Sequence, residues 1–221
     1  MASQTVENYL KALFNLANVD QEVPLSELSN QLKVRTPTAN SMVRKLGSKG
    51  LVTYEKYKPI KLTSEGRKQA ALIIRKHRLT EMFLVEKMGF GWEEVHEIAE
   101  QMEHIKSPIL FERMDELLGF PCVDPHGSPI PDKNGEVSWK SYLTLSDCRI
   151  GDEVVLSALS NSSDDFLKFL NRHNLQLGTI MKIKAVEDFD QSMQLERENG
   201  STETISTMVS ERILVEVISK D

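Results

Sequence analysis

With 221 residues, of which 40% are hydrophobic and 27% charged, the chain is long enough for two or three small domains with folded cores. It has no apolar run near the ~18 residues that span a bilayer, no signal-like N-terminus and two cysteines without CxxC spacing, so a cytoplasmic protein without a disulfide scaffold is expected. The net charge of −6 argues against a chain that coats nucleic acid over its whole surface.

Three short helices are predicted at the start of the chain. Residues 5–17 and 24–32 carry apolar side chains at helical spacing. A connection of three residues leads to a third helix over 36–48, for which Thr36 is the candidate N-cap and Pro37 suits the first helical position. Because many small helical domains contain two helices joined by a tight turn, this unit alone predicts little.

The segment after the third helix predicts a basic β-hairpin. Residues 51–57 and 60–63 are strand-like runs on either side of a Lys58-Pro59 turn. Between residues 31 and 62, eight basic residues and one acidic residue give a local charge of +7. A solvated basic face is the alternative that charge alone leaves open, but a patch on the third helix and hairpin is typical of a phosphate-binding surface. The order of helix, turn, helix and basic hairpin predicts a winged helix-turn-helix.

The middle of the chain is predicted to be helical. A long stretch over 64–88 is broken at residues 89–91 and followed by helices over 92–106 and 109–118. The last helix carries an apolar stripe, which is either core or the seam of a dimer, at Leu110, Met114, Leu117 and Leu118.

A segment rich in Pro and Gly separates these helices from a small β unit. Five strand-like runs, punctuated by glycines, and one short helix at 164–170 predict a five-stranded barrel. The predicted fold class is therefore α+β. Its expected domains are a winged helix-turn-helix over 1–63, an all-α domain over 64–120, a linker over 121–141 and a small β-barrel over 142–221.

Histidine and glutamate gather on one side of the helix predicted over 92–106. Within a sector of about 100°, that helix places His96, Glu100, Glu103 and His104. The preceding helix adds His77 and Glu81 at i and i+4. Imidazole nitrogen and carboxylate oxygen suit Mn, Fe, Co or Zn, and the absence of a thiolate argues against a structural zinc site. One such helix is more often a solvated face, but two in succession predict a metal centre.

The linker contains further potential ligands. Asp124 and His126 lie in the sequence Cys-Val-Asp-Pro-His-Gly over 122–127, where they either belong to an ordinary surface loop or reach a second ion. His173, near the β unit, is expected to be a bystander.

No catalytic motif competes with this interpretation. The chain lacks GxSxG, a Gly-rich phosphate loop and HExxH, and its HEIAEQMEH segment has a different spacing. We therefore expect that the protein is not an enzyme. Two alternatives from other classes stay open: a metallohydrolase with an accessory DNA-binding domain, and a winged-helix regulator that senses an organic ligand.

In this order, these features make the chain resemble the diphtheria toxin repressor family of metal-dependent transcriptional regulators, in its manganese-responsive, three-domain form. The resemblance spans essentially the whole chain and is most specific in ENYLKALFNL, in RKHRLTE at 75–81, in VHEIAEQMEH at 95–104 and in PHGSPIP at 125–131. It implies an SH3-like C-terminal domain, a homodimer, and repression of metal-uptake genes from a palindromic DNA operator when metal is bound.

The resemblance also implies a primary metal site formed by Asn8, His77, Glu100, Glu103 and His104. Members that respond to iron have Met and Cys in place of Asn8 and Glu100, whereas members that respond to manganese have Asp and Glu. Glu100 therefore points to Mn(II), with Fe(II) as the alternative and Zn(II) or Co(II) as substitutes. Asn8 departs from both patterns, and Lys11 stands where manganese regulators can carry an acid.

A second site of the three-domain relatives corresponds to Glu81, Asp124 in place of a Cys, His126, and Asp165 or its neighbour Asp164, with His96 as an ancillary ligand. On the DNA side, the helix over 36–48 is expected to enter the major groove and the hairpin to contact phosphates. The residues expected to contact DNA are Arg35, Thr36, Pro37, Thr38, Asn40, Ser41, Arg44, Lys45, Lys49, Lys56 and Lys58.

The resemblance suggests how metal would control DNA binding. An ion between the first helix and the middle helices would fix the spacing of two recognition helices, through its higher affinity for that arrangement. Without the ion, repulsion among Glu81, Glu100 and Glu103 would leave the spacing undefined.

Overall fold

The computed structural model describes residues 3–17 and 21–219, which divide into two compact units. The first unit contains the chain up to Thr80 together with Ile98–Cys122 and Ile130–Ser138. The second contains Glu81–Glu97, Val123–Pro129 and the chain from Trp139 onward. The expected domains follow the order of the sequence, whereas each unit is assembled from several segments of the chain.

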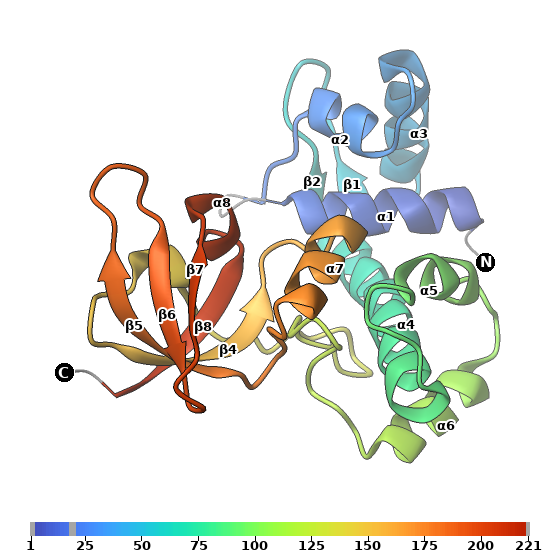
Figure 1. Ribbon diagram of the computed structural model, residues 1–221. Helices are drawn as coiled ribbons and strands as arrows, with labels where there is room; N and C mark the ends of the chain where they lie inside the picture. The colour runs from blue at the N-terminus through green and yellow to red at the C-terminus, as the bar shows by residue number, and fades with distance from the viewer. Residues whose placement is uncertain (1–2, 18–20, 220–221) are drawn as a thin grey trace. The chain divides into compact units, whose positions relative to one another are not determined.

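The first unit begins with the expected winged helix-turn-helix (Figure 1). Its elements are α1 (Gln4–Leu16), α2 (Leu25–Gln31), α3 (Thr36–Ser48), β1 (Val52–Thr53) and β2 (Lys61–Leu62). The two strands are antiparallel. The helices pack together because their apolar positions recur at helical spacing, and the fully buried side chains include Leu10, Leu13, Leu28, Val43 and Leu46.

The start of α3 corrects one detail of the prediction. Arg35 is the N-cap and makes no capping hydrogen bond with its side chain, Thr36 is already helical, and Pro37 follows it. Thr36 is therefore not the N-cap. Proline tolerates this position because the N–H groups of the first turn have no partner within a helix.

Two further helices of the middle region have clear starts and ends. α4 (Ser64–Met88) is one helix of 25 residues. Its start packs so closely that a side chain at Gly66 would lie 1.9 Å from the Leu51 carbonyl oxygen. α6 (Pro108–Leu118) ends at Gly119, whose left-handed φ of 72° suits glycine. None of the helices in the described residues is long and apolar enough to cross a membrane.

The helix predicted over 92–106 is much shorter in the structure. α5 covers His96–Met102, so Glu103 and His104 lie in the turn that follows it, and the expected helical sector of four ligands is wrong. Before α5, the Glu94 N–H donates a hydrogen bond of 3.0 Å to the Gly91 carbonyl oxygen, and this three-residue spacing closes a turn instead of a helix. After α5, the Ile105 N–H donates a hydrogen bond of 2.9 Å to the Met102 carbonyl oxygen, so the chain closes a tight turn there instead of continuing the helix.

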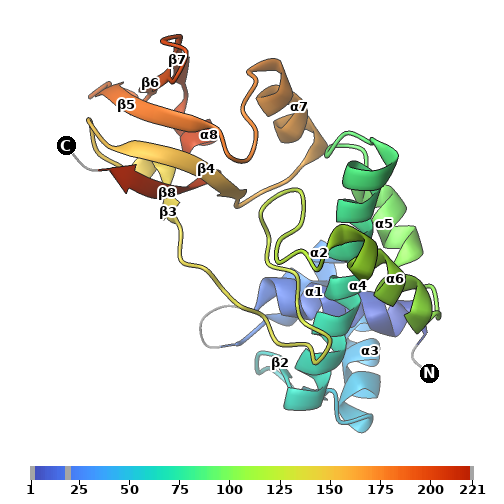
Figure 2. The ribbon, with the colours of Figure 1, turned by 90° about the horizontal axis from the view of Figure 1, so that it is seen from below.

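The second unit contains a six-stranded antiparallel sheet, in the order β3-β8-β4-β5-β6-β7. Figure 2 shows β8 between β3 and β4. The strands are β3 (Leu143–Thr144), β4 (Glu153–Leu159), β5 (Ile180–Val186), β6 (Met193–Arg197), β7 (Thr202–Ile205) and β8 (Ile213–Ser219). A 3-10 helix (Leu145–Asp147) and the helices α7 (Asp164–Arg172) and α8 (Thr207–Ser210) complete the unit.

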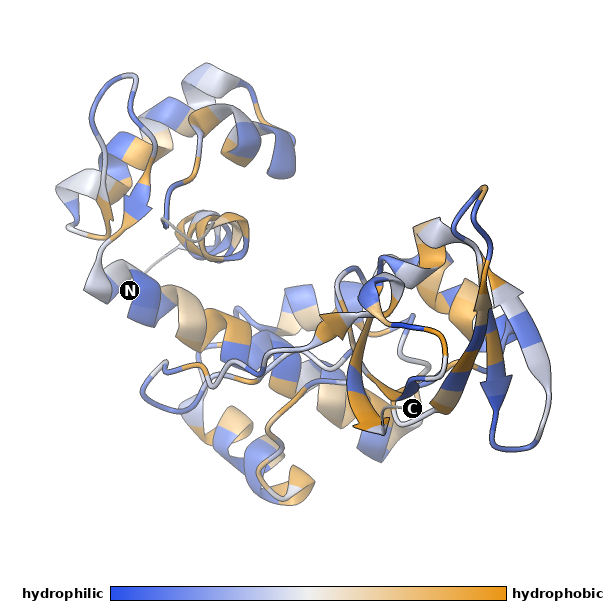
Figure 3. Ribbon diagram, turned by 90° about the vertical axis from the view of Figure 1, so that its left-hand side faces the viewer, coloured by the Kyte–Doolittle hydropathy of each residue, from blue (hydrophilic) through white to orange (hydrophobic). Residues whose placement is uncertain are grey.

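This sheet is the expected SH3-like domain, with one strand more than predicted. The prediction missed β7, in which Ile205 is the one buried residue of a largely polar strand. Strands β4, β5 and β6 alternate buried and more exposed residues, as a sheet with one covered face requires. Figure 3 shows hydrophobic and hydrophilic residues interspersed along the strands of the sheet. Helix α7 contributes Phe166, Leu167 and Leu170 to the same core.

Candidate metal centres and nucleic-acid interface

The residues expected to contact DNA gather on the surface of α3 and the hairpin. Ten of these eleven residues are exposed. Asn40 is partly buried, and its Oδ1 accepts a hydrogen bond of 2.9 Å from the Tyr54 hydroxyl. A cleft of 570 Å³ lies beside them, with Thr36, Lys56 and Lys58 among its lining residues. Exposed cations around a cleft are suited to the DNA backbone.

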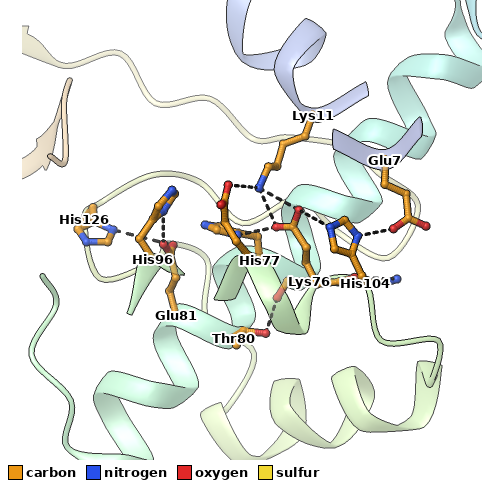
Figure 4. A network of polar contacts seen from close by, with 11 residues as sticks. Glu7, Lys11, Lys76, His77, Thr80, Glu81, His96, His104 and His126 are labelled. Carbon is orange, nitrogen blue, oxygen red and sulfur yellow. Dashed lines mark hydrogen bonds and ion pairs between the residues drawn. The ribbon is translucent and has the colours of Figure 1, made fainter. Parts of the chain in front are cut away.

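The first polar centre consists of Lys11, His77, Glu100, Glu103 and His104, all within the first unit. Figure 4 shows Lys11 reaching from α1 toward the group that contains His77 and His104. Its Nζ lies 3.2 Å from Glu100 Oε1 and 2.9 Å from each carboxylate oxygen of Glu103. His77 Nδ1 lies 2.6 Å from Glu103 Oε2. Two carboxylates of this centre therefore already share one cation, which the protein itself supplies.

Glu103 is the most buried acid of the first centre, with an exposed fraction of 0%. Burial raises the pKa of its carboxyl group, but the hydrogen bond from His77 and the charge of Lys11 outweigh burial and hold the pKa below its ordinary value. The Oε1 atom accepts no hydrogen bond, although Lys11 is close. His104 Nε2 lies 3.8 Å from it. A buried anionic oxygen that faces an imidazole nitrogen is the type of donor pair that divalent metals bind.

His104 is oriented by an acid of α1. Its Nδ1 lies 2.6 Å from Glu7 Oε2, and an ionised carboxylate can only accept a hydrogen bond, so Nδ1 carries the proton. In the neutral ring, Nε2 then presents its lone pair toward Glu103, which is how carboxylates orient metal-binding histidines. Asn8, the expected ligand from α1, is exposed. The structure thus brings Glu7 to His104, and the role of Asn8 as a ligand stays a prediction.

The second polar centre consists of Glu81, His96, Asp124 and His126, all within the second unit. One ligand atom from each of Glu81, Asp124 and His126 can be chosen so that all three lie within 4.8 Å of one another, and all three residues are buried. His126 Nδ1 lies 3.9 Å from Glu81 Oε2 and 3.9 Å from Asp124 Oδ1. Ligand atoms that share one ion at about 2.1 Å lie roughly 3 to 4 Å apart, so this donor set fits a divalent metal.

His126 is held in the orientation that such a site requires. Its Nε2 lies 3.0 Å from the Trp92 carbonyl oxygen, which can only accept, so Nε2 carries a proton, and in the neutral ring Nδ1 is the atom with the lone pair. The loop behind it is rigid for a local reason. A side chain at Gly127, whose φ is 86°, would lie 2.4 Å from the Ser157 carbonyl oxygen of β4, so only glycine permits this close approach.

The remaining predicted ligands lie around the second centre to different degrees. His96 Nδ1 is 3.2 Å from Glu81 Oε1, and Figure 4 shows His96 and His126 directed at Glu81. Asp164 and Asp165 are exposed at the start of α7. Asp165 lines a separate cavity of 520 Å³ with Glu93 and Asn171. The structure therefore brings four predicted ligands together and leaves Asp165 outside that group.

Three contacts of the two centres were not predicted from the sequence: Lys11 with the two glutamates, Glu7 with His104, and Trp92 with His126. Each joins residues far apart in the chain; 92 positions separate Lys11 from Glu103. Glu7 and Lys11 lie at i and i+4 on an amphipathic helix, so their shared face was visible in the sequence, whereas its partner was not.

Comparison with protein families matches three consecutive parts of the chain. Residues 1–60 match the N-terminal DNA binding domain of the iron dependent repressors. Residues 63–132 match the metal binding and dimerisation domain of the same repressors, and residues 143–217 match the FeoA domain. Together these matches follow the order of the winged helix-turn-helix, the helices and the sheet.

Individual proteins agree with these matches. The iron-dependent repressor IdeR of Mycobacterium leprae is 33% identical over 127 residues, which cover 58% of this chain and 55% of that protein. The chain thus spans about half the length of the curated relatives it matches. A solved manganese-dependent transcriptional repressor in complex with manganese has a TM-score of 0.88 and 32% identity, over 96% of this chain and 100% of that one. ScaR with bound Zn²⁺ has a TM-score of 0.77 and 33% identity, over 96% and 99%.

Proposed function

Because this chain belongs to the iron-dependent repressor family of metal-dependent transcription regulators, we propose that it binds operator DNA as a homodimer under the control of a divalent metal. The observation that carries the proposal is the presence, in one chain, of an exposed basic recognition helix and a buried group of acids and imidazoles. A regulator needs both features, whereas neither requires a catalytic role.

The DNA-binding part of the proposal rests on α3 and the hairpin. Thr36, Thr38 and Ser41 are exposed on the first turns of α3, where a recognition helix meets base edges. Arg44 and Lys45 follow on the same helix, and the hairpin adds Lys56 and Lys58. We assign the hydroxyl-bearing residues to base and phosphate contacts, and the cations to phosphate contacts.

The metal part of the proposal rests on the second centre, whose donors fit an ion as they stand. Glu81 and Asp124 supply carboxylate oxygens, His126 supplies Nδ1, and His96 lies beside Glu81. A bound divalent ion would neutralise the two buried carboxylates. Hard oxygen donors without a thiolate favour Mn(II). Fe(II) is the alternative metal, since relatives of this chain are named both for manganese and for iron.

These ligands belong to segments that are distant in sequence. Glu81 lies in α4, whereas Asp124 and His126 lie in the loop over residues 123–129. Asp124 Oδ1 also accepts hydrogen bonds of 2.8 and 2.9 Å from the backbone N–H groups of His126 and Ser128, which shape this loop. A metal bound here would fasten the loop to α4. Its binding energy would then favour whichever arrangement of the protein holds the two together.

The homodimer is proposed from α6. Phe111 and Met114 of this helix are buried, whereas Ile109 and Leu117 are 58% and 62% exposed, and Phe120 just beyond the helix is 66% exposed. The predicted apolar stripe therefore divides into core and surface. Exposed apolar side chains grouped in this way mark association surfaces, and Leu117→Glu should convert the protein to monomers in light scattering. An unchanged mass would place the dimer interface elsewhere.

The central experiment measures metal-dependent DNA binding. A duplex would first be selected from random sequence with the full chain in Mn(II), and its affinity then measured by fluorescence anisotropy with Mn(II) and with chelator. We expect Mn(II) to tighten binding of the wild-type protein by about fivefold to 150-fold, the usual range of coupling between two sites.

Matched variants separate the two parts of the proposal. Glu81→Gln should lose the effect of Mn(II), whereas Glu86→Gln, an exposed glutamate on the same helix, should retain it. Arg44→Ala should weaken DNA binding both with and without Mn(II), whereas the exposed Lys87→Ala should not. Equal DNA affinity of the wild type with Mn(II) and with chelator would overturn the proposal.

A further inference from the structure

The first centre differs from an ordinary metal site because a cation of the protein stands among its acids. The Lys11 side chain is 14% exposed, and its ammonium contacts both Glu100 and Glu103. Since Glu103 is fully buried, the interaction is screened less than an ion pair on the surface. The ammonium therefore balances part of the negative charge that would otherwise attract a metal ion.

An ion bound by Glu100 and Glu103 would need the carboxylate oxygens that Lys11 now contacts. The ammonium and a divalent ion repel each other, and they compete for the same lone pairs. Lys11 must therefore withdraw before a metal can use both glutamates, and the lost contacts lower the net affinity of the centre. In the second centre, the groups nearest to Glu81 are imidazoles: His96 Nδ1 lies 3.2 Å from Oε1 and His126 Nδ1 lies 3.9 Å from Oε2.

From this contrast we propose that Lys11 is an internal competitor of the metal at the first centre. In the metal-free protein, its ammonium takes the place of the ion and joins α1 to the end of α5. The two centres then differ in metal affinity. The centre around Glu81 and Asp124 binds metal at the lower concentration, whereas the centre around Glu100 and Glu103 binds it only at a higher concentration, which Lys11 sets. This proposal rests on the proposed metal-dependent function and adds to it the residue that sets the threshold of one centre.

The test is a titration of the full chain with Mn(II). Binding is monitored by calorimetry and by the electron paramagnetic resonance signal of free Mn(II). The wild type should show a tighter and a weaker class of site. In Lys11→Met the weaker class should tighten by about tenfold or more, because hydrogen bonds between charged groups change an equilibrium by at least that factor. Lys11→Arg keeps the charge and should leave both classes unchanged.

Three further variants make the result specific to Lys11. In the background of Glu81→Gln with Asp124→Asn, the remaining binding reports on the first centre, and Lys11→Met should still tighten it. Lys11→Gln is smaller and polar, and it serves where Lys11→Met does not fold, as judged by circular dichroism. Lys87→Met, at an exposed position of α4, controls for the loss of one positive charge.

The outcomes separate this proposal from the one on which it rests. Wild-type protein that binds no Mn(II) at all contradicts the proposed function itself. Wild-type protein that binds Mn(II), combined with identical affinities in Lys11→Met and Lys11→Gln, keeps the proposed function and overturns the role of Lys11. A gain in affinity for the neutral variants, without a gain for Lys11→Arg or Lys87→Met, supports that role.

Discussion

The two polar centres use the same residue types but balance their charges differently. The first centre combines two glutamates and two histidines with Lys11, whereas the second combines Glu81 and Asp124 with His96 and His126. In the first, a lysine contacts both acids at hydrogen-bonding distance. In the second, His126 Nδ1 lies 3.9 Å from each acid, which is a spacing that suits ligands around an ion. Residue composition alone therefore does not distinguish a centre whose acids already contact a lysine from a centre whose ligand atoms are spaced to bind a metal ion.

This difference predicts that the two centres contribute to stability under different conditions. The first centre should stabilise the protein without metal, because its own cation compensates the buried acid. The second should add stability when metal is present, because a ligand that binds the folded state alone raises its free energy of unfolding.

The largest effect is expected for Glu103→Gln in the presence of chelator. Removing the buried carboxylate leaves Lys11 and His77 without their shared partner, and breaking a buried ion pair in this way costs about 3–5 kcal/mol. Urea unfolding followed by circular dichroism measures the change in the free energy of unfolding. The exposed Glu86→Gln should change it by less than about 0.5 kcal/mol. Equal stability of Glu103→Gln and wild type would show that the first centre does not support the metal-free fold.

A smaller effect is expected at the second centre, and only with metal. At a concentration about 100 times the dissociation constant of the second centre, Mn(II) should raise the free energy of unfolding by roughly 2.7 kcal/mol. Asp124→Asn should abolish this gain, because the amide keeps an acceptor for the loop but loses the negative charge that attracts the ion. Thermal unfolding with Mn(II) and with chelator measures the gain.

Asp132→Asn is the matched control for that change. Asp132 Oδ1 accepts hydrogen bonds of 2.8 Å from the N–H groups of residues 134 and 136, the same pattern that Asp124 forms with residues 126 and 128. The two substitutions therefore disturb similar loops, but only Asp124 lies at a centre. If Asp132→Asn removes the Mn(II) gain as well, loop geometry and not ligation explains the result.

The parts of the fold that depend on local patterns were predictable from the sequence. The winged helix-turn-helix follows from apolar spacing, a tight turn and a basic hairpin, and the structure confirms all of these elements. The strand β7 was missed because its alternation is polar and only Ile205 is buried. The helix over 92–106 was predicted too long because a pattern of apolar residues does not show the turns that the backbone N–H groups of Glu94 and Ile105 close at its two ends.

The candidate site was predictable in residue type but not in arrangement. Clustering of His and Glu pointed to His77, Glu103 and His104 as neighbours, which the structure shows them to be. The single helical face proposed for Glu103 and His104 was wrong, because both follow the end of α5. The contacts that decide how each centre is balanced join α1 to the end of α5, and Trp92 to a loop. Such contacts depend on tertiary packing, so the sequence could mark Lys11 as an unusual residue without showing where its ammonium lies.

The smallest effects compare two neighbours on α1, Glu7 and Asn8, at the first centre. Glu7 accepts the hydrogen bond from His104 Nδ1 and so orients this ring. Glu7→Gln should therefore weaken Mn(II) binding at the first centre by about tenfold, the lower end of the effect of residues that hydrogen-bond to a metal ligand. Asn8 is exposed, so Asn8→Ala should leave that affinity nearly unchanged. Both are measured in a chain whose second centre carries Glu81→Gln and Asp124→Asn. A larger loss for Asn8→Ala than for Glu7→Gln would mean that α1 rotates when metal binds. Asn8 would then be the ligand at the position from which Lys11 has withdrawn.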